Sequence, residues 1–431
     1  MKVVIVGGGF GGLQLAKSLN NRPGFEITLV DKVNYHQFQP LFYQVATAGL
    51  DASNISFPLR KLFQRSKNIR IRLAAVQQIV PDQNKIVTDC CEIEYDILVI
   101  ATGAETNFFG NANLIANALP MKSTSEALQI RHRLLQNFES ALNVTSDKER
   151  EKYMTVVIVG GGPTGVELSG AISEMKSYVL PKDYPELDFT QMKIYLIENG
   201  GETLEHMSDK SSRQSLEYLQ AMGVTVRLRT KLVDYDGENV QLESGEIFQA
   251  STVIWAAGIK GNLLQGMKPE VVAKGNRIKV NRYNQVAGYE NIYAIGDIAF
   301  METPLWPKSH PQVAAVAIQQ AKLLAENLKR IERKSSSQVE EFEYYDKGSM
   351  ATVGRNRAVV DLPRPKLHFG GFLAWLIWMF LHLMLILGVK NKLFIFMNWV
   401  YNYFTHDQSL RLIFKDFYKP KVPAKLAEVK V

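Results

Sequence analysis

The sequence has very little cysteine: Cys90 and Cys91 are its only two thiols, and they are neighbours. Adjacent cysteines rarely form a bridge, so a disulfide framework is excluded, and the pair lacks the spacing of a metal site. We therefore expect no metal, a reducing compartment, and an ordinary strand or turn around the two thiols.

An export signal is also lacking. Met1 and Lys2 lead at once into an apolar strand, without a preceding apolar core or cleavage site, so we expect no secretion. Of the 431 residues, 46% are apolar and 22% are charged, which argues against long disorder or a polytopic membrane protein. A chain of this length predicts two or three domains.

Positive charge is in excess, with 50 Lys plus Arg against 43 Asp plus Glu and a net charge of +7. Such an excess favours an anionic partner, either nucleic acid or lipid. Much of it lies beside aromatic and aliphatic residues in the C-terminal third, as in a membrane-surface patch. We therefore expect anionic lipid and no nucleic acid.

A glycine-rich turn joins the first predicted strand, residues 3–6, to a helical pattern over residues 13–19. Gly7 permits the turn, Gly9 lets the backbone approach a pyrophosphate, and Gly12 packs the helix on the strand. The helix N-terminus supplies N–H donors and positive potential. The pattern predicts a dinucleotide site, against the alternative of a purely structural glycine turn.

Two further strands complete this unit. Residues 27–30 end on Asp31, 19 residues after Gly12, where a carboxylate can accept from ribose hydroxyls. Residues 97–100 end on Ala101, Thr102 and Gly103. Strand, helix and acid together favour a nucleotide site over a structural turn.

The same pattern recurs about 150 residues later. Residues 156–159 form a strand, Gly160, Gly162 and Gly165 form the turn, and residues 166–175 form a helix. Two copies of one unit predict two nucleotide-binding domains.

In the second copy, strand 194–197 ends on Glu198 and strand 253–255 ends before Ala257 and Gly258. A carboxylate at position 198 would accept from an adenosine 2′-hydroxyl and repel a 2′-phosphate. This favours NADH over NADPH, with a solvated strand-end charge as the alternative.

A last strand, residues 292–296, precedes Asp297, and a helix is predicted over about residues 312–331. Asp297 is a candidate polar clamp for the first nucleotide, with a plain cap as the alternative. The N–H groups of Ala314 and Ala315 are candidates to stabilise negative charge on a reduced isoalloxazine.

Three more residues bear on this helix. Pro311 is expected near its first turn. Gln319 and Gln320 lie one to two turns inside it, where glutamines are either solvated or functional.

These motifs, in this order, resemble the two-dinucleotide-binding-domain flavoproteins and, within them, the type II NADH:quinone oxidoreductases, also called alternative NADH dehydrogenases. The likeness covers nearly the whole chain. It rests on residues 6–12, 38–46, 101–104, 160–168, 255–258 and 294–297.

The resemblance implies FAD on the first unit and NADH on the second, with Glu167 between nicotinamide and flavin. Asp31, Lys32 and Val76 would lie on the adenosine side of FAD, and Asp297 on its ribityl chain. The expected cofactor-binding residues are Gly7, Gly9, Phe10, Gly12, Asp31, Lys32, Val76, Thr102, Gly103, Asp297, Ala314, Ala315, Gly160, Gly162, Gly165, Glu167, Glu198, Ala257 and Gly258.

One departure concerns the quinone. Many family members carry two glutamines spaced by four on the distal helix. Here Gln319 matches the second, and Ala315 occupies the place of the first. Glu167 and Gln319 are thus the candidate catalytic residues. Disulfide reductases and sulfide:quinone oxidoreductases are disfavoured, because they need separated redox cysteines.

The C-terminal module contains an 18-residue apolar run, residues 372–389, whose polar atoms come only from Trp375, Trp378 and His382. A helix of this length would reach about 27 Å, enough to consider a membrane span. Basic residues flank it on both sides, and residues 393–404 are too short to return across a bilayer. The flanking residues are Arg355, Arg357, Arg364, Lys366, Lys390, Lys392, Arg411, Lys415, Lys419, Lys421 and Lys425.

We therefore expect this run to enter one leaflet only. Residues 393–404 place Asn398 and Asn402 on one face and aromatic residues over the rest, as in an interfacial helix. A buried dimer interface is the alternative, and the family resemblance allows a homodimer as well.

The predicted fold is α/β, with two Rossmann-like domains and a C-terminal membrane-surface helical region. The expected limits are residues 1–118 and 263–334 for FAD, 119–262 for NADH and 335–431 for membrane docking. The expected enzyme is a non-electrogenic NADH:quinone oxidoreductase of the respiratory chain, peripheral on the cytoplasmic side of the cell membrane. Two alternatives are an NADH-dependent reductase of a ferredoxin- or rubredoxin-type carrier and a non-enzymatic nucleotide-sensing scaffold.

Overall fold

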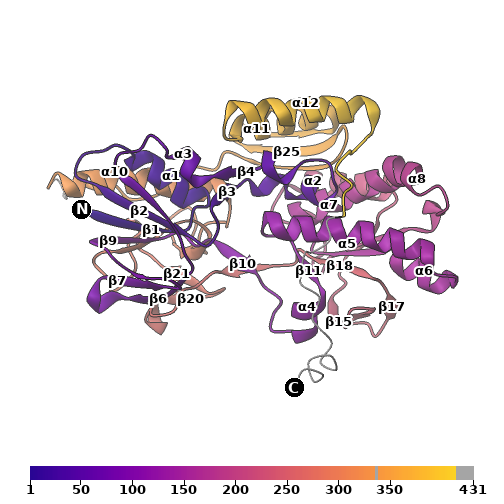
Figure 1. Ribbon diagram of the computed structural model, residues 1–431, viewed down its shortest axis with the longest axis horizontal. Coiled ribbons are helices and arrows are strands. Elements are labelled where there is room, and N and C mark those ends of the chain that lie inside the picture. Colours follow the sequence, from indigo (N-terminus) through magenta and orange to yellow (C-terminus); the bar gives the residue numbers. More distant parts are fainter. Residues whose placement is uncertain (335–337, 414–431) are drawn as a thin grey trace, which may run out of the picture.

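A computed structural model describes residues 1–334 and 338–413. Two five-stranded parallel sheets form the body, one at each end of the molecule (Figure 1). The first has the order β22-β9-β1-β2-β5 and the second β11-β18-β12-β13-β14. Their strands are β1 (Lys2–Val6), β2 (Glu26–Asp31), β5 (Ile69–Leu73), β9 (Ile97–Ile100), β22 (Ile292–Ala294), β11 (Leu119–Pro120), β12 (Thr155–Val159), β13 (Lys193–Ile197), β14 (Thr225–Arg227) and β18 (Thr252–Trp255).

The two sheets repeat one plan, which confirms the predicted α/β fold with two Rossmann-like units. In each, a buried central strand leads through a glycine turn into a helix: α1 (Phe10–Leu19) and α7 (Pro163–Glu174). Gly7 and Gly160 have φ of +108° and +112°, a conformation that disfavours any side chain. A Cβ on Gly12 or Gly165 would overlap the carbonyl oxygen of Gly7 or Gly160, so only glycine lets the helix approach its strand.

The chain passes between the two sheets twice. The crossing segments, β10 (Ala104–Thr106) and β19 (Ile259–Gly261), pair as antiparallel strands. Both crossing segments leave the carboxyl ends of their sheets, next to residues 101–103 and 256–258. The two sheets are thereby joined by a short two-stranded connection.

Further helices and small sheets complete the two units. The helices are α2 (Phe42–Ala46), α3 (Leu59–Leu62), α4 (Ala112–Asn117), α5 (Thr124–Asn143), α6 (Asp147–Tyr153), α8 (Leu180–Asp183) and α9 (Asp209–Ala221). The strands are β3 (Tyr35–Gln37), β4 (Ser56–Pro58), β6 (Val76–Val80), β7 (Lys85–Thr88), β8 (Glu92–Glu94), β15 (Leu232–Tyr235), β16 (Asn239–Leu242), β17 (Ile247–Gln249), β20 (Val272–Ala273), β21 (Arg277–Lys279) and β23 (Ala299–Phe300).

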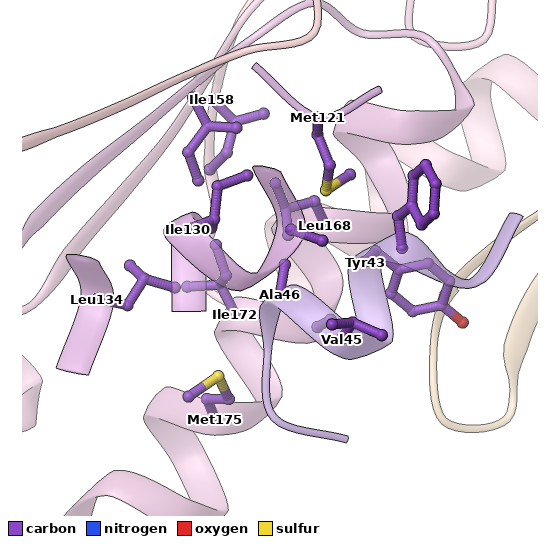
Figure 2. Packing of buried hydrophobic residues seen from close by; sticks show 14 of the residues in the cluster. Tyr43, Val45, Ala46, Met121, Ile130, Leu134, Ile158, Leu168, Ile172 and Met175 are labelled. Atoms are coloured by element: carbon purple, nitrogen blue, oxygen red, sulfur yellow. The ribbon is translucent and has the colours of Figure 1, made fainter. Parts of the chain in front are cut away.

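The helix α2 lies against α5 and α7 and connects the first unit to the second. Figure 2 shows its Val45 and Ala46 packed with Ile130 of α5 and Ile172 of α7, while the Tyr43 hydroxyl points away from this cluster. Each fully buried aliphatic side chain of this kind stabilises the fold by roughly 1.5–3 kcal/mol. The packing fixes α2 against the face of α7 that follows the second glycine turn.

The distal helix differs in detail from the prediction. It is α10 (Ala314–Glu332), which packs on α1 and begins at Ala314 rather than 312. Pro311 therefore lies before the helix and not in its first turn. The last strand also ends earlier, at Ala294, because Gly296 adopts φ of +76° and opens a 3₁₀ turn over Gly296–Ile298.

The C-terminal region was predicted as helical, but it begins with a three-stranded antiparallel sheet: β24 (Ser349–Gly354), β25 (Arg357–Pro363) and β26 (Lys366–Gly370). Asn356, with φ of +61°, makes the first turn possible. Two helices follow, α11 (Gly371–Leu385) and α12 (Val389–Thr405), and lie side by side on one surface of the molecule (Figure 1).

The apolar run over 372–389 is not one helix. α11 ends at Leu385, and Gly388, with φ of +79°, precedes α12. Within residues 1–334 and 338–413, no helix combines the length and apolar character that a membrane crossing requires. Four of the basic residues expected to flank the apolar run, Lys415, Lys419, Lys421 and Lys425, lie outside the described residues.

Candidate active site

The first glycine turn forms an open cradle. At Gly9 a side-chain carbon would meet nothing within 4 Å, so a phosphate group can approach the backbone at the start of α1. Asp31, at the end of β2, accepts from the N–H of Gly8 at 2.5 Å and of Val33 at 2.8 Å. Burial raises the pKa of Asp31, and these hydrogen bonds and the charge of Lys32 oppose the shift.

Residues near Val76 and at the start of α1 lie beside this cradle. The Ala74 N–H donates to the Asp31 carbonyl at 2.9 Å, which brings the start of β6 at Val76 beside the end of β2. Phe10 opens α1 with its ring 5.2 Å from that of His36 and 5.9 Å from that of Phe38.

The end of β9 is fixed from the crossing segment. The Thr102 hydroxyl donates to the Asn262 carbonyl at 2.7 Å, and the Asn262 N–H donates to the Gly103 carbonyl at 3.1 Å. Gly103 has φ of +69°, and a Cβ on it would meet nothing within 4 Å, so this stretch of backbone is open on one side. Thr102 and Gly103 are thus held in place by Asn262 of the second crossing segment.

Asp297 lies in the turn after β22. Burial raises the pKa of its carboxyl, while the charges of Lys122 and Arg277 act against that rise. Gln312 donates to the Asp297 carbonyl at 3.0 Å and ties this turn to the segment before α10. Ala314 and Ala315 are the first two residues of α10, so their N–H groups are among the unpaired donors of a helix start.

The second cradle repeats the first. A Cβ on Gly162 would meet nothing within 4 Å, and Glu198 accepts from the N–H groups of Gly161 and Gly200, each at 2.5 Å. A Cβ on Gly160 would press against the backbone of Ala256 and Ala257, and Gly258 adopts φ of +154°. Each cradle therefore combines an open glycine, a helix start and a strand-end carboxylate, which fits one dinucleotide.

Glu167 lies on the first turns of α7. Burial raises the pKa of its carboxyl to about 8, against the Thr352 N–H and the Trp378 indole, which lower it. The Thr352 N–H lies 3.4 Å from Oε1 of Glu167. The structure therefore brings the C-terminal sheet and α11 to Glu167, the residue that the family resemblance implies between the two cofactors.

The two glutamines of α10 behave differently. The amide of Gln319 donates to the Tyr345 carbonyl at 2.9 Å and accepts from the Tyr345 N–H at 3.1 Å. Gln320, with 1% of its surface exposed, accepts from the Gly296 N–H at 2.7 Å. Neither amide is simply solvated, and Gln320 fixes the turn that carries Asp297.

Sequence reasoning missed two residues of this region, Lys122 and His382. Lys122 carries no motif, and only the fold brings it to Asp297. His382 of α11 stacks on Trp378 with ring centroids 3.9 Å apart and binds the Trp378 carbonyl through Nδ1 at 2.8 Å. Burial lowers the pKa of His382 to about 4. Its place within an otherwise apolar run was the available signal.

The two cysteines lie in the turn between β7 and β8, exposed and free, with their sulfurs 3.5 Å apart. Among the described residues, no cluster of three or more His, Cys, Asp or Glu side chains is arranged for a metal.

Two nucleotide cradles, joined by the two-stranded connection of β10 and β19, define a protein with two dinucleotide-binding domains. The family model of the pyridine nucleotide-disulphide oxidoreductases matches residues 1–321, and the model of the NDH2 C-terminal domain matches residues 346–406. The chain is 34% identical over 415 residues to the type II NADH:quinone oxidoreductase Ndh of Mycobacterium tuberculosis, covering 92% of this chain and 87% of that relative. The chain belongs to the type II NADH:quinone oxidoreductase family, as its motifs predicted.

Solved structures agree with this assignment at the level of the fold. NDH2 from Plasmodium falciparum, in complex with NADH, superimposes with a TM-score of 0.86 at 22% identity, over 96% of this chain and 99% of that chain. The sulfide:quinone oxidoreductase of Aquifex aeolicus superimposes with a TM-score of 0.69 at 21% identity, over 91% of this chain and 92% of that chain.

Proposed function

We propose that this chain carries out the reaction of its family at the membrane surface, with FAD in the first cradle and NADH in the second. As a member of the family, it is a flavoprotein that oxidises NADH and reduces quinone without pumping protons. The observation that carries the proposal is the recurrence of strand, glycine turn, helix and strand-end acid at Asp31 and at Glu198.

When bound, FAD would supply the redox chemistry, which is the acceptance of hydride from NADH and the transfer of electrons to a quinone. In the proposal, the backbone around Gly7, Gly9 and Gly12 holds its pyrophosphate, and Asp31 binds its ribose. Lys32 and Val76 lie at the adenosine. Phe10, Thr102, Gly103, Asp297, Ala314 and Ala315 line the remainder of the same molecule.

The second cradle is proposed to hold NADH in the corresponding way. Gly160, Gly162 and Gly165 face the pyrophosphate, and Glu198 selects the unphosphorylated ribose. Ala257 and Gly258 lie beside the nicotinamide end, and Glu167 stands between nicotinamide and flavin. We assign Gln319 to the quinone end, where its two hydrogen bonds to Tyr345 shape the wall of that site.

The proposed domain limits are residues 1–118 and 263–334 for FAD and 119–262 for NADH, with 335–431 for membrane docking. The sheet memberships support these limits. All strands of the second sheet fall between Leu119 and Trp255, whereas β22 returns to the first sheet from beyond them.

The quinone is proposed to be drawn from a membrane on which α11 and α12 lie. Their inner faces are buried at Ala374, Trp378, Ile395 and Trp399, and their outer faces expose a set of large apolar side chains. This outer set is Phe372, Leu373, Leu376, Phe380, Leu381, Met384, Leu385, Val389, Leu393, Phe394, Phe396, Met397, Val400, Tyr401 and Phe404.

Basic side chains flank this apolar face. Lys390 is exposed in the first turn of α12, and Arg364 and Lys366 are exposed in the hairpin before α11. Inserting a few of the apolar side chains stabilises docking by roughly 1.5–3 kcal/mol each, and each nearby cation adds about 1 kcal/mol on anionic lipid. The occupant that fits is an anionic leaflet, which we propose to be the cytoplasmic face of the cell membrane.

Vesicle binding tests the docking proposal. Phe380→Ser with Phe404→Ser should weaken binding to anionic vesicles at low and high salt, whereas Ile247→Ser, at an exposed position of β17, should not. Lys390→Glu should weaken it mainly at low salt. A purified chain that ignores vesicles and sediments as a dimer through α11 and α12 would contradict the proposal and favour the homodimer interface.

The acceptor is tested by steady-state NADH oxidation with a soluble quinone, with and without a ferredoxin or rubredoxin. Turnover with quinone alone is the expected result. Turnover only with the protein carrier would favour the reductase alternative, and nucleotide binding without turnover would favour the sensing scaffold.

A further inference from the structure

A cavity of about 120 Å³ lies where the C-terminal region meets the NADH-type unit. Its walls come from α2, α7 and the turn after it, β24, α11 and α12. A cavity of this volume has room for several water molecules. Its apolar walls include Trp375, Met379 and Trp399, and its polar lining includes carboxyl, phenol and imidazole groups that can exchange protons.

Two carboxyl groups of α7 line this cavity, Glu167 and Glu174. They are seven residues apart, and therefore lie on one face of the helix about 10 Å from each other along its axis. Each accepts from a backbone N–H of the C-terminal sheet region, Glu167 from Thr352 at 3.4 Å and Glu174 from Arg355 at 2.5 Å. The C-terminal region thus forms one wall along both carboxyls.

A phenol lies within electrostatic reach of both carboxyls. Burial raises the pKa of Tyr43 well above its usual value, and the charges of Glu167 and Glu174 raise it further. Gln44 donates to the Tyr43 oxygen at 2.8 Å and in turn accepts from the Trp399 indole N–H at 2.8 Å. Because Gln44 donates to this oxygen, the hydroxyl proton of Tyr43 is directed away from Gln44.

Polar residues surround the far end of the cavity. Arg355 donates to the carbonyls of Asn402 at 2.7 Å and Tyr403 at 3.0 Å, so it caps the end of α12. A third partner of the Arg355 guanidinium, His406, lies ring to ring with Tyr178 at 4.7 Å and is partly exposed. Arginine stays charged, so it can hold this end in place but cannot pass a proton.

Glu174 is suited to hold a proton here. Burial raises the pKa of its carboxyl, and the N–H and charge of Arg355 with the charge of Arg357 act against that rise. The Gln408 side chain also lines this end, and its buried Oε1 lacks a hydrogen-bond partner among the described residues. An unpartnered acceptor beside a cavity of this size is suited to bind water.

The family reaction needs a route by which a proton enters from solvent. NADH, one proton and a quinone give NAD⁺ and a quinol. NADH contributes two electrons and one proton as hydride, and the quinol contains two added electrons and two added protons. One proton per turnover must therefore come from solvent, and the route that brings it carries no electrons.

We propose that this cavity is the entry route of that proton, with Glu174 as the residue that takes it from solvent. Water at the end near His406 gives a proton to Glu174. Tyr43 and cavity water pass it on, and Glu167 recovers the proton that it has given to the reaction. The proposal rests on the NADH:quinone activity and on Glu167 being at the reaction centre.

The test compares two acceptors in Glu174→Gln. Ferricyanide takes electrons and no proton, so NADH:ferricyanide activity and the bleaching of the flavin by NADH should stay within about two-fold of wild type. Quinone reduction should fall by about ten-fold or more, in line with the loss of a group that transfers protons. Proton uptake, followed with an indicator dye in weak buffer, should slow by the same factor.

Three comparisons separate a proton role from a structural one. Glu174→Asp should restore part of the quinone rate, and the rate of Glu174→Gln should rise as pH falls more steeply than that of wild type. Glu149→Gln, at an exposed position of α6, should change nothing. Flavin content, measured in parallel, should match wild type in Glu174→Gln.

Several outcomes would overturn the proposal. These are an unchanged quinone rate and pH profile in Glu174→Gln, an equal loss with both acceptors, or a raised quinone KM at unchanged kcat. The last result would place the quinone itself in the cavity. A wild-type protein that failed to reduce any quinone would instead contradict the proposed function.

Discussion

Gln319 and Tyr345 hold each other by two hydrogen bonds, from Nε2 of Gln319 to the Tyr345 carbonyl at 2.9 Å and from the Tyr345 N–H to Oε1 of Gln319 at 3.1 Å. The pair joins α10 to the segment that leads into the C-terminal sheet. The place where the family pattern expects a quinone contact is therefore also a junction between the flavin-type unit and the C-terminal region.

Gln319→Ala should loosen this junction. Each hydrogen bond contributes about 0.5–1.5 kcal/mol net, so we expect a several-fold rise in the quinone KM with an unchanged rate of flavin bleaching by NADH. Gln320→Ala is the matched control on the same helix, because its amide holds the Gly296 N–H instead. It should lower flavin content. Slower bleaching in Gln319→Ala would place that residue on the NADH side.

Glu198→Gln should narrow the preference for NADH over NADPH. The carboxylate lies at the end of β13, where a 2′-phosphate would be repelled, and glutamine removes that repulsion. We expect the ratio of kcat/KM values to fall by about ten-fold, equivalent to roughly 1.4 kcal/mol. Glu202→Gln, an exposed neighbour, is the control. An unaltered ratio would refute the assignment.

Asp297→Ala should weaken retention of FAD. A hydrogen bond to a charged group contributes roughly 1.5–3 kcal/mol, and Asp297 is the proposed partner of a flavin hydroxyl. The variant should purify with less flavin and lose it faster on dilution. Asp297→Asn keeps an acceptor and should show a smaller loss. Full occupancy and unaltered release in both variants would exclude this role.

Glu167→Gln should change how stability depends on pH. The pKa of Glu167 rises from 4.5 to about 8 in the folded chain, so its contribution is fully present below pH 4.5 and is lost as pH rises through about 8. Glutamine cannot ionise. Relative to wild type, the melting temperature of the variant should therefore increase steadily between pH 5 and 8, by several degrees in all. A constant difference across this range would contradict the raised pKa.

The local patterns of the sequence predicted both nucleotide units well, because glycine turns, buried strands and strand-end acids are determined by neighbours in the chain. They also placed Asp31 and Glu198, which the structure shows bound to equivalent N–H groups, of Gly8 and Gly161. The start of α10 was placed two residues early because Pro311 is also compatible with an extended segment before a helix.

Contacts between distant segments were not predictable in the same way. The sheet β24–β26 was missed because its strands stand beside an apolar run that dominated the interpretation of the region. The contact of Glu174 with Arg355 spans 181 residues, and neither residue belongs to a motif. Only the packing of the C-terminal sheet on α7 brings the two together.

The most direct test of the account is an anaerobic double-mixing experiment on the purified holoprotein. NADH is mixed first and a soluble quinone second, and the flavin absorbance is followed throughout. The account predicts that NADH bleaches the flavin, that quinone restores it, and that both steps are at least as fast as steady-state turnover. Bleaching by NADH that quinone does not reverse, or no bleaching at all in a fully flavin-loaded protein, would contradict it.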